Sequence, residues 1–100
     1  MHVTFQAVHF AADNKLKEYI NEKLQKLIKF HPKILQTTVY MKLENSGTVK
    51  DKVIEVKMNV PGSTLIASNN DKTFESSFDD ALEVIKRQLK RINTKAKEAR

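Results

Sequence analysis

Hydrophobic and polar residues alternate in four short stretches of the chain, and this period of two is typical of strands that bury one face. The first stretch, residues 2–8, places Val3, Phe5 and Ala7 on one side. The other three cover residues 37–44, 52–60 and 64–69. The inward residues of the two longer ones are Val39, Met41 and Leu43, and Ile54, Val56, Met58 and Val60. We therefore predict four strands, each with one buried face.

Two other stretches repeat hydrophobic residues every three or four positions, as amphipathic helices do. The first begins after Asp13, a favourable N-cap, and runs to about Phe30. His31-Pro32 ends it, because proline disfavours helical geometry in the preceding residue. The second starts near Asp71 or Thr73 and continues into the C-terminal tail. The predicted buried stripes are Leu16, Ile20, Leu24 and Leu27 in the first helix, and Phe74, Phe78, Leu82, Ile85, Leu89 and Ile92 in the second.

The connections between these elements favour one arrangement. Asn45-Ser46-Gly47 is a turn signal, and Pro61-Gly62 suits the tight type II turn of a hairpin. The order is then β-α-β-β-β-α, an α+β fold in which the first helix is the right-handed crossover between two parallel strands. The later strands are antiparallel, and both helices pack on one face of a four-stranded mixed sheet. We expect residues 1–100 to form a single domain, with a basic tail at about residues 94–100.

Composition narrows the class of protein. The chain has 100 residues, of which 40% are hydrophobic and 30% charged, an ordinary globular balance. It contains no cysteine, which excludes disulfides and thiolate metal sites and fits a reducing cytoplasm. There is no secretory signal pattern and no apolar stretch approaching the roughly 18–20 residues that span a bilayer. We expect a cytoplasmic protein that has no membrane partner.

The net charge of +6 is concentrated at one end of the chain. Residues 86–100 hold seven bases and one acid, Glu98, which equals the net charge of the whole chain. These bases are Lys86, Arg87, Lys90, Arg91, Lys95, Lys97 and Arg100. Bases near a helix C-terminus complement the helix dipole, and a charge run can simply be a solvated face. Seven bases exceed what the dipole explains, so we interpret the segment as a nucleic-acid contact.

The first helix and the loop after it add further bases: Lys15, Lys26, Lys29 and Lys33. Lys23 is unusual because it falls within the apolar arc near Leu16 and Leu27. One interpretation is a lysine whose stem covers the edge of the core. The other is a lysine in the groove between the helices, directed at a ligand that crosses both. The pattern leaves both open, and in the second case the bases of both helices form a single patch.

Other chemistry finds little support in the sequence. His2, His9 and His31 have no metal-ligand spacing, and the adjacent pair Asp79-Asp80 diverges on a helix by about 100°. There is no nucleophile motif, glycine-rich phosphate loop or metal cluster. We therefore expect no cofactor, no small-molecule substrate and no catalysis. Tyr40 and Phe10 are the aromatics that can be exposed, too few for a base-reading surface.

Three segments together resemble a known family. They are Leu16-Lys17-Glu18-Tyr19-Ile20 followed by Lys23 and Lys26; Leu65-Ile66-Ala67-Ser68; and Phe74-Glu75-Ser76-Ser77-Phe78-Asp79 leading to Lys86-Arg87-Gln88-Leu89-Lys90-Arg91. The chain resembles the ribosome hibernation promoting factors and ribosome-associated translation inhibitors, in their short form. The element order is also similar to a double-stranded-RNA-binding domain with one extra strand in front.

The resemblance implies binding to ribosomal RNA of the small ribosomal subunit, in the channel for messenger and transfer RNA. Such a protein inhibits translation by occlusion and preserves idle ribosomes. The RNA-binding residues expected from the pattern and the resemblance are Lys23, Lys26, Lys29, Lys86, Arg87, Lys90, Arg91, Lys95 and Lys97. Whether ribosomes are also paired, with a second ribosome or a helper factor as partner, stays open. The alternatives are a general double-stranded-RNA-binding module and an interaction protein for an acidic partner.

Overall fold

The computed structural model describes residues 2–8, 10–46 and 49–98, without the side chains of residues 45–51 and 93–98. The elements in chain order are β1 (His2–Val8), α1 (Asn14–Phe30), β2 (Gln36–Ser46), β3 (Val49–Val60), β4 (Ser63–Asp71) and α2 (Phe74–Glu98). This order confirms the predicted β-α-β-β-β-α fold. Within the described residues, no helix combines the length and the hydrophobicity needed to cross a bilayer.

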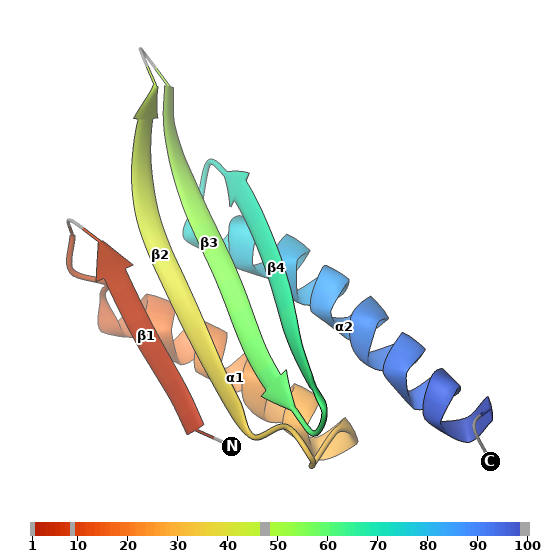
Figure 1. The fold of residues 1–100 in the computed structure, drawn as a ribbon. Coiled ribbons are helices and arrows are strands. Elements are labelled where there is room, and N and C mark those ends of the chain that lie inside the picture. Colours follow the sequence, from red (N-terminus) through yellow and green to blue (C-terminus); the bar gives the residue numbers. More distant parts are fainter. Residues whose placement is uncertain (1, 9, 47–48, 99–100) are drawn as a thin grey trace.

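The sheet has the order β1-β2-β3-β4 and is mixed, as predicted. β1 runs parallel to β2, with Phe5 opposite Val39, and α1 connects these two strands. β2 and β3 are antiparallel, as are β3 and β4. Figure 1 shows both helices on the same face of the sheet, with α1 behind β1 and β2 and α2 near β4. Among the residues that the structure describes, none forms a helix on the other face of the sheet.

Local signals account for where the elements begin and end. The Asp13 carboxylate accepts a hydrogen bond of 2.7 Å from the Leu16 amide and caps α1, as predicted. Thr73 does the same for α2, because its hydroxyl accepts from the Ser76 amide at 3.1 Å. Of the two predicted starts, the one at Thr73 is therefore correct. Gly62 has φ +78°, the positive value that the second central residue of a type II turn requires.

The core lies between the sheet and the two helices. The predicted inward residues of β3 are all buried, and so are the four stripe residues of α1. In α2 the stripe is buried from Phe74 to Leu89, with Ile92 only partly buried. The prediction is wrong for Leu43 and Ala7, which were expected to face the core but are exposed. Pairing of β1 with β2 ends at Lys42, so Leu43 lies where β2 continues beyond the end of β1 (Figure 1).

The predicted turn at Asn45-Ser46-Gly47 is also misplaced. β2 continues through Ser46, which is the register partner of Val49 in β3. Gly47 lies outside the described residues. Backbone pairing along a continuous antiparallel ladder overrides the turn preference of Asn45 and Ser46, since strand propensity depends strongly on context. The hairpin is consequently longer at this end than the sequence pattern predicts.

Candidate nucleic-acid interface

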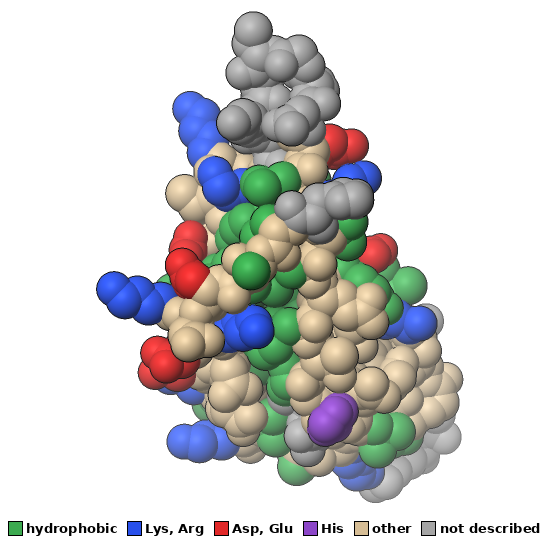
Figure 2. Space-filling view, turned by 90° about the vertical axis from the view of Figure 1, so that its left-hand side faces the viewer, with side chains coloured by type: hydrophobic (Ala, Val, Ile, Leu, Met, Phe, Trp, Pro, Cys, Tyr) green, Lys and Arg blue, Asp and Glu red, His purple; other side chains and the backbone are tan. Residues whose placement is uncertain are grey.

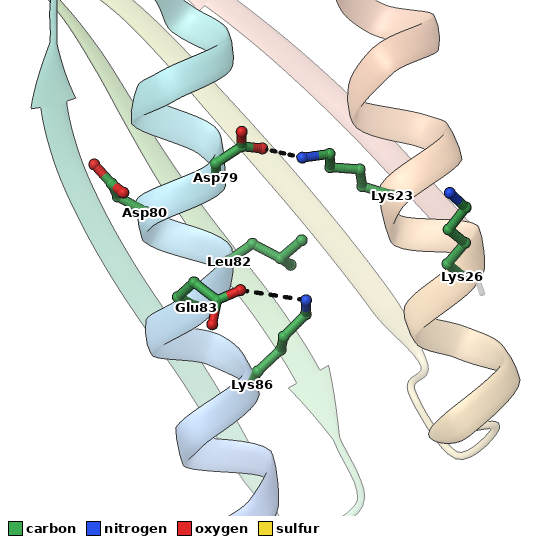
Figure 3. Close-up of a pocket in the computed structure, with 7 residues that line it drawn as sticks. All are labelled: Lys23, Lys26, Asp79, Asp80, Leu82, Glu83 and Lys86. Atoms are coloured by element: carbon green, nitrogen blue, oxygen red, sulfur yellow. Dashed lines mark hydrogen bonds and ion pairs between the residues drawn. The ribbon is translucent and has the colours of Figure 1, made fainter.

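The two helices lie side by side and leave a groove of about 350 Å³ between them (Figure 3). Its described lining consists of Lys23 and Lys26 from α1 and of Asp79, Asp80, Leu82, Glu83 and Lys86 from α2. The structure thus brings three predicted RNA-binding residues together across the helices. Three carboxylates lie among these three amines, so the groove is of mixed charge and the predicted single basic patch is interrupted by acids.

Lys23 stands in this groove, but it already has partners. Its Nζ donates a hydrogen bond to Asp79 Oδ1 at 2.5 Å and lies 4.7 Å from the centroid of the Tyr19 ring. The Tyr19 hydroxyl donates to Asp79 Oδ2 at 2.8 Å. Burial lowers the pKa of Lys23, but the contacts with Asp79 and Tyr19 outweigh it, and the pKa is raised above its ordinary value. The structure therefore places Lys23 in the groove between the helices, where Asp79 is its partner.

The acids around Lys23 have separate partners. Asp80 accepts a hydrogen bond of 2.9 Å from Asn69 Nδ2 of β4, while Asp79 is directed to α1 (Figure 3). This confirms that the two adjacent aspartates diverge. Glu83 forms an ion pair of 3.4 Å with Lys86 one turn further along α2. Among the described residues, no three His, Asp or Glu side chains are grouped closely enough to hold a metal ion.

Beyond the groove, α2 carries exposed bases. Arg87, Lys90 and Arg91 are exposed, as is Lys86 in the groove lining, and all four lie off the buried stripe formed by Ile85 and Leu89. Lys29 is exposed in the last turn of α1 and is not part of the groove lining described here. Lys95 and Lys97 lie within α2, but their side chains are outside the described set, as is Arg100. On the face at the β1 edge, by contrast, basic and acidic side chains are interspersed (Figure 2).

Some important residues were not predicted. Ser77 is fully buried, and its hydroxyl donates a hydrogen bond of 2.6 Å to the carbonyl of Lys52, which ties the start of α2 to β3. Tyr19 is four residues before Lys23 on α1, a spacing from which their contact can be predicted. Asp79 lies on another helix, so no local pattern relates it to Lys23. Phe10, considered as an exposed aromatic, stacks on Phe74 with ring centroids 5.0 Å apart.

The fold and the exposed bases define a class: a small α+β domain with a basic helix beside a groove of mixed charge. The sequence profile of the family described as "Sigma 54 modulation protein / S30EA ribosomal protein" matches residues 3–97. The chain belongs to this family. This confirms the resemblance to ribosome hibernation promoting factors that three segments of the sequence carry.

Two curated relatives and two solved structures are similar to the chain. The ribosome hibernation promoting factor of Pseudomonas putida is 27% identical over 95 residues, covering 95% of this chain and 89% of the relative. The ribosome hibernation promotion factor of Deinococcus radiodurans is 27% identical over 81 residues; the match covers 80% of this chain but only 42% of that longer protein. A ribosomal subunit interface protein from Coxiella burnetii shares the fold with a TM-score of 0.84 at 17% identity, covering 94% of this chain and 99% of the other. The N-terminal domain of Thermus thermophilus Protein Y gives a TM-score of 0.78 at 19% identity, with 92% and 99% covered.

Proposed function

We propose that this protein binds the small ribosomal subunit in the channel for messenger and transfer RNA, where it inhibits translation and preserves idle ribosomes. The observation that carries the proposal is the family match over residues 3–97, together with relatives whose names describe ribosome hibernation. Occlusion requires binding alone, so the protein needs neither catalysis nor a cofactor. Because its partner is the ribosome, it works in the cytoplasm. Residues 1–100 act as one ribosome-binding domain with a basic tail.

The exposed bases of α2 supply most of the binding free energy in this proposal. Arg87, Lys90 and Arg91 are exposed and follow Glu83, the last acid of α2 before Glu98, so this part of the helix offers bases to a phosphate backbone. Lys86, Lys95 and Lys97 extend the same helix, and Lys29 adds a base from the end of α1. Lys23 and Lys26 contact RNA at the groove, where Lys23 exchanges its carboxylate partner for a phosphate.

Sedimentation with purified ribosomes at low and high salt tests the proposal. We expect salt-sensitive co-migration with the small subunit that excess short duplex RNA does not displace. Displacement by the duplex would make the protein a general double-stranded-RNA binder. Absence of co-migration at low salt, with capture of an acidic protein after nuclease treatment, would favour an interaction protein. The same gradients reveal whether ribosomes shift to paired particles.

A further inference from the structure

A second groove, of about 370 Å³, lies at the end of the molecule where α1 stops. Its walls come from the last residue of α1, the loop that follows, the turn between β3 and β4, and the middle of α2. Figure 1 shows the end of α1 next to the β3–β4 turn, with the second half of α2 to their right. Its described lining includes Phe30, Lys33, Leu89 and Ile92.

Phe30 is the feature of this groove that the fold does not explain. It is 80% exposed, although it ends a helix whose apolar stripe, Leu16, Ile20, Leu24 and Leu27, is buried in the core. Phe10, which precedes α1, packs against Phe74 instead. A single exposed apolar residue needs no explanation by itself. Phe30, however, stands at the rim of an apolar groove and offers a free aromatic face there.

The charge around this groove differs from that of the groove between the helices. Lys33 lines it and Lys29 precedes Phe30, while none of the described lining residues is acidic. On α2, the lining residue Leu89 is followed directly by the exposed bases Lys90 and Arg91. Of these bases, Lys33 lines the groove, whereas Lys90 and Arg91 are turned from Leu89 by about 100° and 200° around the helix and flank it. Such a lining suits a ligand that combines a negative charge with a flat, apolar group.

We propose that Phe30 stacks on an unpaired nucleobase of ribosomal RNA while the neighbouring lysines and the bases of α2 hold the flanking phosphates. Aromatic side chains recognise unstacked bases in loops and at helix ends in this way, and stacking tolerates any base. In an interface with a protein partner, by contrast, an aromatic anchor residue is buried in a well-packed pocket. A ring that projects at 80% exposure fits a base stacked on it better. This inference rests on the proposed function and adds an unpaired nucleotide to its ligand.

The test compares Phe30→Ala, Phe30→Leu and Phe30→Trp in binding to purified small subunits over a range of salt. Loss of one stacked base weakens binding by about 5- to 150-fold, and Leu restores little of it because it lacks a π face. Trp retains binding. The salt slope stays that of the unaltered protein, since no phosphate contact is removed. Ile66→Ala, at a 50% exposed residue on the outer sheet face, is the matched control and leaves binding unchanged.

Two results would overturn the inference. One is Phe30→Ala binding as tightly as the unaltered protein. The other is full restoration by Leu, which indicates an apolar protein pocket as the partner. Because Phe30 is exposed, all three variants keep the unfolding temperature of the unaltered protein, so a binding change is not a folding change. If the unaltered protein itself fails to bind the subunit, the proposed function fails; if only the Phe30 variants behave unexpectedly, the stacking inference alone fails.

Discussion

At the scale of single residues, the amine of Lys23 is held by its neighbours in the groove between the helices. Its amine is held between a carboxylate from α2 and the ring of Tyr19 from its own helix. Both members of the ion pair remain more than a third exposed, at 36% and 39% of their side chains. Such a pair is weak enough to exchange partners, because solvent screens it. In the complex that we propose, Asp79 thus orients Lys23 and also competes with phosphate for it.

The first prediction concerns the stability of this pair at alkaline pH. The pKa of Lys23 is raised in the folded protein, so its stabilisation is fully present below the ordinary value of 10.5 and disappears as the pH rises through the folded value. Asp79→Asn should cost about 0.2–1 kcal/mol at neutral pH, the range of an exposed pair. Denaturant unfolding should show this difference shrinking well above pH 10.5. A difference independent of pH would contradict the assignment.

The same substitution should have the opposite effect on RNA binding. Without the Asp79 carboxylate, Lys23 no longer has to leave an anionic partner, and one negative charge facing the phosphates is gone. Asp79→Asn should therefore tighten binding to the small subunit by up to about fivefold, the equivalent of one exposed ion pair. Titration at fixed salt measures it, with Glu75→Gln in the exposed first turn of α2 as the charge-matched control. Weaker binding of Asp79→Asn would show that the pair positions Lys23 and does not compete for it.

Ser77 carries a third prediction at this scale. Ser77→Ala removes the donor to the Lys52 carbonyl and leaves that acceptor without its partner, at a cost of about 1–3 kcal/mol. The neighbouring Ser76→Ala is the control, because Ser76 donates to the carboxylate of Asp71 at the surface. We expect it to cost less and to raise the lowered pKa of Asp71 towards its ordinary value. Equal losses of unfolding free energy in the two variants would count against the role given to Ser77.

At the scale of elements, periodicity was sufficient wherever an element meets the core on one face. The stripe Leu16, Ile20, Leu24 and Leu27 and the alternation in β3 predicted both the elements and their buried sides. Where an element leaves the core, the same rule failed. Leu43 continues the alternation of β2, yet it is exposed because the strand passes beyond its neighbour β1. Sequence alternation reports a preferred face, but only the tertiary arrangement shows whether something covers it.

The candidate interface was predictable to the same extent. The bases of α2 could be assigned to an exposed surface because they fall off its apolar stripe. The carboxylates facing Lys23 and Lys26 could not, since Asp79 is 56 residues from Lys23 and the distance between them depends on how the helices pack. Phe30 was predicted only as the end of α1. Its exposure follows from where the helix stops relative to the β3–β4 turn, which local sequence does not specify.

At the scale of the whole molecule, the charges of the helix layer fall into two regions, one of mixed sign and one basic. The groove between the helices combines amines and carboxylates, whereas the described part of α2 beyond Glu83 carries exposed bases and no acid before the last residue, Glu98. A local positive field of this kind accelerates association with a polyanion and steers the polyanion towards the basic surface. The outer face of the sheet carries isolated lysines, among them the exposed Lys42 and Lys57. The account therefore predicts that RNA binds at the helix layer.

The most direct test compares two double charge reversals that change the net charge equally. Arg87→Glu/Lys90→Glu alters α2, and Lys42→Glu/Lys57→Glu alters the outer sheet face. Binding to purified small subunits is measured over a range of salt for both variants and for the unaltered protein. We predict that the α2 variant binds far more weakly, with a salt slope shallower by about 2 because two phosphate contacts are lost, while the sheet variant keeps the slope of the unaltered protein. Equal affinity and equal slope in the two variants would contradict the claim that α2 binds ribosomal RNA.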